Sequence, residues 1–560
     1  MRNRQRRYRA RVSMWLVIVV ATSLSGCATV NPQADYARSR ELIAQSSGVG
    51  TAYDPEKEPL SAEDLQPRLA DGLTLTEAVE IALLNNRRLQ GAFQEIGIAR
   101  ADWVQAGLLS NPTVGIGLLF PEGGGTSNIH AALAQNIVDL WQMPVKKRLT
   151  ERKVEQRVVE VARLAGELAV ETKRAYYEAV AATELLSIAR LSVELYQKSY
   201  NATRTQREAG TGTALAENLQ RGELLQAQLD LQNAEAAARN TRRQLVRLLS
   251  VDEEVATVEL TDALPAGVAP ATDAEALVAL AREHRLDLQA LQQAVLAGDA
   301  EIQLEYLRIF PEIMVGVSAE RNESRALPGR DIAADFARSS LRAGQPTIPD
   351  IQTPGERRAA QEQDIEFKIG PNIEITLPIF DQNQAQIARA RYGRVQAVKS
   401  YEDLFINIAQ DIRAAVDQAR AQWTSVAFYH DELLPQAERS LEFSTAAWQA
   451  GTADVLTLLA SQRNLLATRR QYVSAHAAAA ASLADLERAV GLPLGRVQAA
   501  DRGGRKSESA PEDAGGDWTA HYEALRRAAG NWTGSAPAAW RLYPFLRQGL
   551  DAGPFKANRF

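Results

Sequence analysis

The sequence predicts a mainly α-helical fold with a small β part, arranged as two tandem structural repeats. Three observations lead to this fold class: an apolar repeat of about 3.5 residues along very long stretches, a second copy of the whole pattern, and one stretch of strict apolar–polar alternation. Charged residues make up 24% and aromatic residues 6% of the 560 residues, which excludes a disordered chain and a helical membrane protein. The formal net charge of -6 gives no reason to expect a nucleic-acid partner.

The N-terminus has the form of an export signal. Six Arg precede a short apolar run, Met14 to Ala21, and small residues lead up to Cys27. We therefore expect residues 1–26 to be a signal peptide. Cys27 is the only cysteine, so no intramolecular disulfide can form. Its context, Leu24-Ser25-Gly26-Cys27, resembles the lipobox of bacterial lipoproteins, in which the thiol is acylated. A plain secretory signal with an incidental cysteine is the alternative.

The longest helical pattern runs from about 146 to 209 and ends at Gly210-Thr211-Gly212-Thr213. From Val154 onward, apolar residues recur in alternating steps of four and three, which predicts left-handed coiled packing. At 1.5 Å per residue, roughly 64 helical residues reach about 95 Å. Its seam is rich in Ala, so the partner helices must approach closely. Such a rod is typical of a structure that spans a distance.

An internal repeat relates the two halves of the chain. A displacement of 199 residues brings Pro112 onto Pro311, and a displacement of 241 brings Gly210-Thr211 onto Gly451-Thr452. The displacements differ by 42 residues, which predicts an insertion in the second copy at about 321–363. We expect each copy to hold a helix, two short strands, a very long helix, a tip loop and a return helix.

The expected parts follow one another in the order that the repeat dictates. The second long helix contains Pro435, which removes one backbone hydrogen bond and predicts a local kink. The expected bounds are a signal peptide at 1–26, an extended tether at 27–72, a first repeat at 73–250 (strands at about 113–120 and 128–138, long helix at about 146–209, tip at 210–213, return helix at 214–250), a linker at 251–273, a second repeat at 274–493 (strands at about 313–320 and 365–380, insertion at about 321–363, long helix at about 384–449, tip at 451–454, return helix at 455–490), a linker at 494–516 and an aromatic extension at 517–560.

The clearest strand alternates apolar and polar residues over about ten positions, as is typical of a strand between lipid and water. Phe367, Ile369, Ile373 and Ile375 stand on its apolar side. A half-buried strand of a soluble sheet has the same period. However, the flanking rods offer no second apolar sheet, and the chain is exported. Four strands cannot close a barrel, and lipid does not tolerate an open edge. We therefore expect an oligomer, in which three chains supply twelve strands.

Four segments, in this order within the repeat, resemble the TolC-like outer-membrane efflux proteins, also called outer-membrane factors. The resemblance covers about Leu73 to Pro493, and implies a homotrimer with a twelve-stranded outer-membrane β-barrel joined to a twelve-helix periplasmic α-barrel. It also implies docking onto a periplasmic adaptor that couples to an inner-membrane pump or exporter. The segments are Gln105-Ala106-Gly107-Leu108-Leu109-Ser110-Asn111-Pro112, Leu377-Pro378-Ile379-Phe380-Asp381, Leu434-Pro435-Gln436-Ala437-Glu438 and Ala450-Gly451-Thr452-Ala453-Asp454-Val455-Leu456.

The resemblance further implies where adaptor contact and gating occur. Gly210-Thr211 and Gly451-Thr452 match the glycine-bearing tips at the periplasmic entrance. Some members carry an acidic ring beyond the second tip, whereas Thr457 and Ala460 stand at those places here.

Two acidic residues near the tips are the remaining candidates for the gate. Glu217 and Asp454 stand close to the tip glycines. The alternative is that both are solvated charges at helix N-termini, where the helix dipole favours them.

These features predict a passive exit duct in the outer membrane, in contact with its lipid and without a cofactor or catalytic residues. The segments at 105–112 and 377–381 are most similar to heavy-metal cation efflux components, yet the five His are scattered and form no metal-ligand pattern. A lipidated periplasmic adaptor with long helical hairpins is the alternative, but it needs compact β domains that the sequence does not show. No nucleophile elbow, phosphate loop or zinc signature indicates an enzyme.

The C-terminal extension departs from the family pattern. Its aromatic patch, at 517–560, allows a short helix packed on the periplasmic wall, a partner-binding segment or a disordered end.

Overall fold

The computed structural model describes residues 28–57, 72–120, 127–251, 259–265, 273–323, 332–348, 365–493 and 495. The chain divides into two units, Met1–Val497 and Gln498–Phe560, and every described residue belongs to the first. The expected signal peptide, Cys27 and the aromatic extension therefore lie outside the described residues.

The two halves of the chain have the same order of elements, as the internal repeat predicts. The first contains α4 (Leu75–Asn85), α5 (Arg87–Ala106), β1 (Thr113–Leu119), β2 (Asn128–Asn136), α6 (Asp139–Glu208) and α7 (Ala214–Leu249). The second contains α8 (Ala274–His284), α9 (Leu286–Leu307), β3 (Ile313–Glu323), α10 (Ile332–Ala343), β4 (Ile365–Ile375), α12 (Gln384–Phe428), the π-helical turn η2 (Tyr429–Leu433), α13 (Leu434–Gln449) and α14 (Val455–Val490).

The expectation of an extended tether at 27–72 is wrong over Gln33–Ser47, which forms helix α2. Tyr36 and Ile43 of this helix are buried against the first repeat, and the Asp35 carboxylate pairs with the Arg100 guanidinium of α5. The Ser39 hydroxyl donates to the backbone oxygen of Val158 on α6 at 3.3 Å. The sequence shows little periodicity here because α2 is short and is stabilised by tertiary packing rather than by a long stripe.

Helix α6 is 70 residues long and begins at Asp139, earlier than the sequence pattern indicates. Its seam residues are buried, including Val158 and Ala165, which have no exposed surface. The two Thr on the seam are also buried, yet both are satisfied by their own helix. Thr172 Oγ1 donates to the oxygen of Leu168 at 2.7 Å, and Thr203 Oγ1 donates to the oxygen of Ser199 at 3.1 Å. The buried seam of α6 therefore contains two Thr whose hydroxyls are both hydrogen-bonded within the helix.

The second long helix is not continuous, because the turn η2 separates α12 from α13. Within this turn the N–H of Leu434 donates to the oxygen of Tyr429, five residues earlier. Pro435 follows immediately and has no N–H to donate to the oxygen of Asp431. A wide turn beside a helical proline is a known cause of helix bending.

The four strands form one antiparallel sheet in the order β1-β2-β3-β4, so β1 and β4 are its edges. Strand β3 continues to Glu323, into the expected insertion, and β4 ends at Ile375, before Pro378. Cross-strand partners share a face, and the register places one apolar set on the same side of all four strands. That set is Val114, Ile116, Leu118, Ile129, Ala131, Leu133, Val315, Val317, Ala319, Phe367, Ile369, Ile373 and Ile375.

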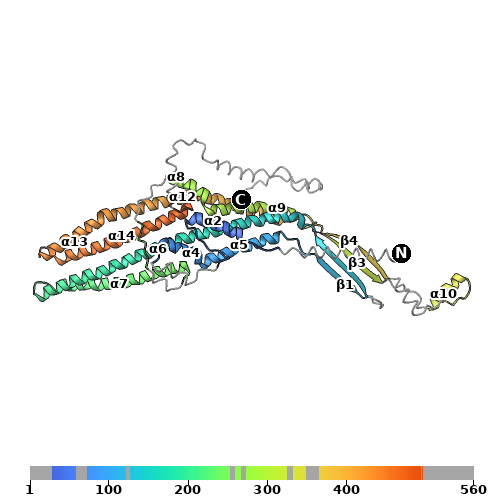
Figure 1. Cartoon of the computed structure of the whole chain (residues 1–560), viewed down its shortest axis with the longest axis horizontal. Coiled ribbons are helices and arrows are strands. Elements are labelled where there is room, and N and C mark those ends of the chain that lie inside the picture. The colour runs from blue at the N-terminus through green and yellow to red at the C-terminus, as the bar shows by residue number, and fades with distance from the viewer. Residues whose placement is uncertain are drawn as a thin grey trace, which may run out of the picture. The chain divides into compact units, whose positions relative to one another are not determined.

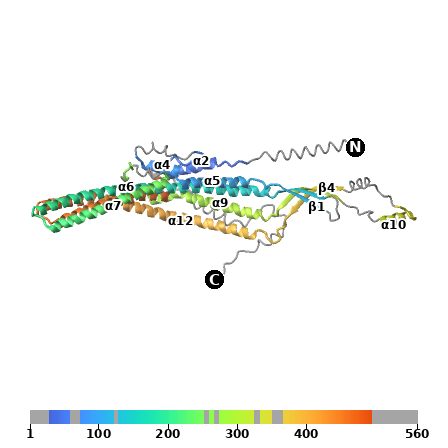
Figure 2. The ribbon, with the colours of Figure 1, turned by 90° about the horizontal axis from the view of Figure 1, so that it is seen from below.

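Both ribbon views place the strands beyond one end of α5, α6, α9 and α12, and the two helix tips at the other end (Figures 1 and 2). Helix α6 runs between these ends and packs against α5, α7, α9 and α14. The main core lies along α6, where α2, α4, α5, α7 and α14 contact it. A second core joins α8, α9, α12 and the end of α14.

Candidate functional site

The two helix tips have the same backbone geometry. Gly210 and Gly451 adopt φ values of +77° and +72°, in the left-handed region that glycine tolerates best. The N–H of the following Thr donates to a carbonyl five residues earlier, Thr211 to Gln206 and Thr452 to Ala447, at 2.9 Å in both tips. The Thr hydroxyls donate to these same oxygens at 3.1 and 3.0 Å. The predicted Gly-Thr pairs are therefore equivalent structural corners.

The two candidate gate acids have different surroundings. Glu217, in the first turn of α7, pairs with Arg207 of α6 at 2.5 Å, and its side chain is 16% exposed. This contact clamps the first tip, since it joins the helices on either side of the loop. Asp454 stands at the N-cap of α14 but makes no side-chain cap hydrogen bond. The structure thus assigns Glu217 a role within the tip, while Asp454 keeps its carboxylate available.

Polar contacts between the two hairpins lie just beyond the tips, and sequence reasoning missed them. Arg470 of α14 pairs with Asp230 of α7 at 3.1 Å. Arg463, about two helical turns closer to the tip on the same helix, pairs with Glu223 of α7. The Gln462 amide donates to Ser199 Oγ of α6 at 2.8 Å in a buried position.

A signal for these contacts does exist in the sequence. Both Arg–carboxylate pairs are separated by 240 residues, close to the repeat displacement. Equivalent return helices therefore place complementary charges near one another. Burial raises the pKa of the Tyr196 phenol to about 12, with Glu223 adding to the shift, so this neighbour remains neutral in the seam.

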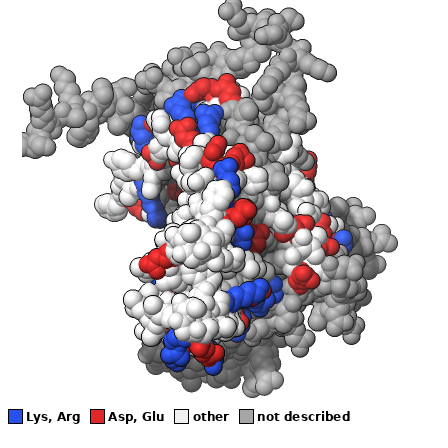
Figure 3. Space-filling model, turned by 90° about the vertical axis from the view of Figure 1, so that its left-hand side faces the viewer, with Lys and Arg blue, Asp and Glu red and all other residues white. Residues whose placement is uncertain are grey.

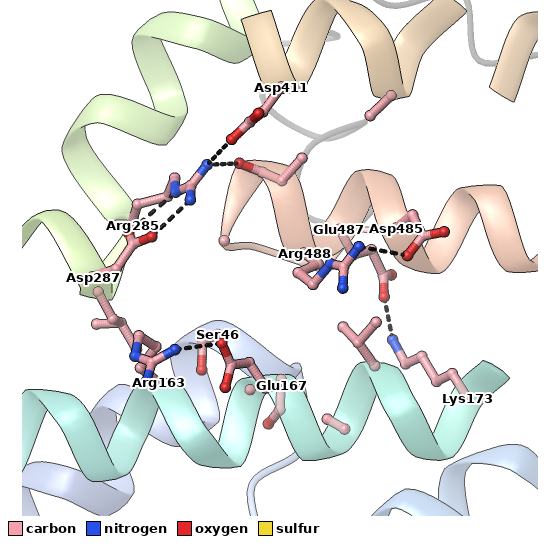
Figure 4. A pocket seen from close by; sticks show the side chains of 18 of the residues that line it. Ser46, Arg163, Glu167, Lys173, Arg285, Asp287, Asp411, Asp485, Glu487 and Arg488 are labelled. Atoms are coloured by element: carbon pink, nitrogen blue, oxygen red, sulfur yellow. Dashed lines mark hydrogen bonds and ion pairs between the residues drawn. The ribbon is translucent and has the colours of Figure 1, made fainter. Parts of the chain in front are cut away.

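A charged cavity of about 530 Å³ lies where the C-terminal end of α14 meets the start of α9, with α2, α6 and α12 around it (Figure 4). Lys173 of α6 pairs with Glu487 of α14 at 2.5 Å, and Arg285 pairs with Asp287 at 2.6 Å and Asp411 at 3.7 Å. The Lys173–Glu487 pair joins the two repeats, while the pairs of Arg285 lie within repeat 2. Because these charges pair with one another, we interpret the cavity as structural.

The junctions of the two repeats are built by equivalent hydrogen bonds. In repeat 1, the Asn86 amide donates to the oxygen of Leu248 at the end of α7, at 2.8 Å. In repeat 2, the Arg285 guanidinium donates to the oxygen of Ala489 at the end of α14, at 3.3 Å. The two donors are related by the displacement of 199 and the two acceptors by that of 241. In each repeat, a carbonyl in the last turn of the return helix thus accepts a hydrogen bond from the N-cap residue of an earlier helix, α5 in repeat 1 and α9 in repeat 2.

The face of the sheet opposite its apolar side is polar. His130 and Glu320 are cross-strand partners with Nε2 and Oε1 3.7 Å apart, and Lys368 pairs with Glu366 at 3.0 Å on the same face. On the apolar face, by contrast, Ile116 is 74% and Ile369 is 68% exposed within one chain. A sheet of this kind fits between an apolar and an aqueous medium.

Charges of both signs are interspersed on the molecule when it is viewed from the left-hand side of Figure 1, the side of the tips (Figure 3). Over the described ranges, His, Cys, Asp and Glu form no group of three or more that could hold a metal ion.

None of the helices in the described part of the chain is long and apolar enough to cross a membrane.

The fold and its sites define a class of protein in which a membrane-facing β part is carried on long paired helices that end in two glycine tips. The pattern of the family described as "Outer membrane efflux protein" matches residues 277–492. The cobalt-zinc-cadmium resistance protein CzcC of Cupriavidus metallidurans is 23% identical over 73% of this chain and 87% of its own length. The toluene efflux pump outer membrane protein TtgC of Pseudomonas putida is 24% identical over 86% of this chain and 95% of its own length.

Solved structures share the fold. The outer-membrane channel OprN covers 80% of this chain and 95% of its own, with a TM-score of 0.58 at 19% identity. The outer membrane protein VceC of Vibrio cholerae covers 77% of this chain and 99% of its own, with a TM-score of 0.58 at 15% identity. The match to this family pattern over residues 277–492 confirms the resemblance that the sequence predicts.

Proposed function

We propose that this protein is the outer-membrane exit duct of a tripartite efflux system. It acts as a passive homotrimer that carries cargo from the periplasm to the exterior. Its relatives are outer-membrane efflux proteins, which favours this function over a periplasmic adaptor. Such a duct needs no catalytic chemistry. It needs a closed wall, a water-filled interior and an entrance that a partner protein can open.

The observation that carries the proposal is a four-stranded sheet with one continuous apolar face and two open edges. In lipid, each unpaired backbone group costs several kcal/mol, so β1 and β4 require further strands. Pairing β4 of one copy with β1 of the next closes a ring, and three copies supply twelve strands. The polar face with His130, Glu320 and Lys368 then lines the interior.

The helical part also has exposed apolar surfaces that further copies would cover. Within one chain, Leu225 and Leu229 of α7 are 56% and 51% exposed, and Phe428 and Phe443 at the other side of the hairpin pair are 56% and 70% exposed. Helix α7 and the α12–α13 rod flank the α6 and α14 pair, so each presents an unpartnered apolar side. A second copy covers both sides if its α7 packs beside the α13 of its neighbour, giving twelve long rods in three copies.

The two ends of the duct have different partners. The tips with Gly210, Thr211, Gly451 and Thr452 are the entrance onto which the adaptor docks, and the adaptor couples the duct to an inner-membrane pump. Asp454 is the acidic residue that remains available there. At the other end, acylation of Cys27 anchors the mature N-terminus in the outer membrane.

The cargo is chosen by the partner pump rather than by a site in the duct. Relatives are named for metal resistance and for toluene efflux, although they share this fold with similar identity. The described residues offer no metal-binding group. A duct that is only a passage needs none.

The mass of the complex in mild detergent tests the proposal. Light scattering should report three chains per particle, and an Ile369→Asp variant, which charges the apolar face, should assemble poorly in the membrane. The matched control is Gly370→Asp on the polar face of the same strand, which should assemble. A stable monomer of the unmodified protein, or equal assembly of the two variants, would contradict a trimer closed through these strands.

A further inference from the structure

Helix α10 lies in the connection between β3 and β4. The hairpin connects the two strands at the end away from the long helices, because β2 and β3 are joined through those helices (Figure 1). In a duct that crosses the outer membrane, this end faces the exterior. The inference below rests on that proposed function.

The apolar face of the sheet ends in a boundary pair on this side. Arg321 of β3 and Phe367 of β4 are cross-strand partners on the apolar face, and Ala319 with Ile369 precede them. Arginine and aromatic side chains are the residues that settle at a membrane–water boundary. Eight residues separate Glu323 from Ile332, which reach about 28 Å at full extension. Helix α10 therefore begins within reach of the membrane surface.

The helix and the turn after it expose large apolar side chains. Phe336 is 41%, Leu341 83% and Ile348 80% exposed. Gly344, with φ +67°, ends the helix, and the chain folds back so that the N–H of Thr347 donates to Ser340 Oγ at 2.9 Å. Helix and turn thus form one small unit. A helix of 12 residues is marginal in water by itself, since isolated helices need about 12 to 15 residues even in favourable sequences. It requires a surface to lie on.

The positions of the charged residues on α10 indicate what kind of surface the helix lies on. At 100° per residue, Arg338 and Arg342 lie one turn apart on one side of α10, while Phe336, Ala337 and Leu341 lie on the other. Asp335 lies on the same side as the two Arg, so α10 carries a formal +1, and the insertion at 321–363 carries seven Arg against six acidic residues, although the whole chain carries -6. An amphipathic helix with Arg on its polar side binds anionic lipid surfaces, its apolar side in the acyl boundary and its Arg at the phosphates.

We propose that α10 lies in the headgroup layer of the outer leaflet, with Phe336, Leu341 and Ile348 inserted and Arg338 and Arg342 bonded to lipid phosphates. Each copy of the duct then carries its own surface helix beside the barrel mouth. The occupant of the apolar side is lipid, and not a neighbouring α10 that covers the mouth.

Single introduced cysteines test this in the full-length protein, because the one native cysteine is the residue proposed to be acylated. Leu341→Cys is labelled with an environment-sensitive dye and reconstituted in vesicles of phosphatidylcholine with phosphatidylglycerol. Nitroxide-bearing lipid should quench most of its fluorescence, and aqueous iodide should quench little. The unsubstituted protein measures background labelling at Cys27.

Two sites on β4 separate the failure of this inference from the failure of the duct. A label at Ile369→Cys on the apolar face should be quenched by the nitroxide lipid, and a label at Gly370→Cys on the polar face should not. If Ile369 is not quenched, the proposed membrane barrel is wrong. If Ile369 is quenched while the Leu341 label is quenched by iodide, the barrel stands and the surface helix is wrong. A Leu341 label shielded from both quenchers would overturn the inference in favour of packing between copies.

The arginines are tested in the same labelled background. Replacing Arg338 and Arg342 with Gln should reduce lipid quenching of the Leu341 label in anionic vesicles to the level seen in phosphatidylcholine alone. Replacement by Lys keeps the charge and should retain most of the quenching. Equal quenching of the Gln and Lys variants in anionic vesicles would show that phosphate contact does not hold the helix.

Discussion

Gly210 and Gly451 are single residues that decide how the longest helices of the protein reverse direction. Each stands at positive φ, and each lets the next Thr return two hydrogen bonds to a carbonyl of the helix that has just ended. A Cβ at either position meets no heavy atom within 4 Å, so space is available. The requirement for glycine is conformational, and a substitution acts through the backbone alone.

Gly451→Ala and Gly210→Ala should each destabilise the tip by about 1 to 2 kcal/mol, the cost of a left-handed backbone for a residue with a Cβ. Hydrogen exchange of the amides around 447–454 or 206–213 should rise accordingly. The control is Gly222→Ala in α7, where a Cβ also meets open space but the backbone is helical. That variant should be neutral or more stable, by up to about 1 kcal/mol. Unchanged exchange at both tips would refute the conformational explanation.

Asp139, the first residue of α6, links the long helix to the corner before β1. Burial acts to raise the pKa of its carboxyl, but hydrogen bonds from Ser110 and Lys146 outweigh it, and the pKa is lowered below 3.8. The Ser110 N–H donates to it at 3.1 Å and Lys146 Nζ at 3.0 Å. A lowered folded-state pKa means that the carboxylate contributes stability above the unfolded pKa, and loses it as pH falls through the folded value.

Asp139→Asn should therefore lower the melting temperature at neutral pH. The difference from the unmodified protein should shrink as pH falls below about 3.8. Thermal unfolding across this range measures it. A constant difference at all pH values would show that the ionised form has no special contribution.

At the scale of elements, the long helices were predictable from sequence because their period repeats over many turns, whereas α2 was not. Strands β1 to β4 follow from alternation, since one face of the sheet is apolar between Gln135 and Arg321. Pro435 predicts a local kink, but the apolar periodicity marks neither the π-helical turn η2 nor the start of α6 at Asp139. The tips could be located from glycine and the repeat. The contacts across the hairpins have a sequence signal in their 240-residue separation, but the apolar periodicity does not show which equivalent positions face each other.

The pair of Lys173 and Glu487 joins helices of different repeats, and its side chains are only 17% and 13% exposed. Lys173→Met should destabilise the protein by about 1 to 3 kcal/mol, because it leaves a largely buried carboxylate without its partner. Lys173→Met combined with Glu487→Leu should recover part of that loss.

The control is Lys198→Met on the same helix. Lys198 pairs with Glu194 four residues earlier, and both are exposed, at 73% and 60%. Its loss should have little measurable effect, since exposed pairs contribute little to stability. Thermal unfolding of these three variants and of the unmodified protein provides the measurement, and equal effects of Lys173→Met and Lys198→Met would contradict a buried ion pair.

On the scale of the whole molecule, one chain is an incomplete wall. Its sheet has two open edges, and its rods have exposed apolar sides that further copies would cover in the proposed trimer. The polar and apolar faces of the sheet lie at one end of the helices and the tips at the other (Figure 2). Function as a duct belongs to the assembly, although every surface that the assembly needs can be identified on a single chain.

Paired cysteines at Thr211 and Thr452 should crosslink and reduce transport, because both tips stand at the entrance of the proposed duct. Each single-cysteine variant, and the pair under reducing conditions, should transport normally. Efflux from cells that carry the partner pump provides the measurement. Normal transport after verified crosslinking would remove these tips from the entrance.

The equivalent junction donors Asn86 and Arg285 would give the proposed trimer a mixed symmetry. Around three copies, six geometrically similar junctions would alternate between a neutral amide contact and a charged one. Because the Arg285 side chain is only 13% exposed, salt would screen its contacts much less than those of a surface ion pair. Such a ring would be sixfold in shape and threefold in the charge of its junctions.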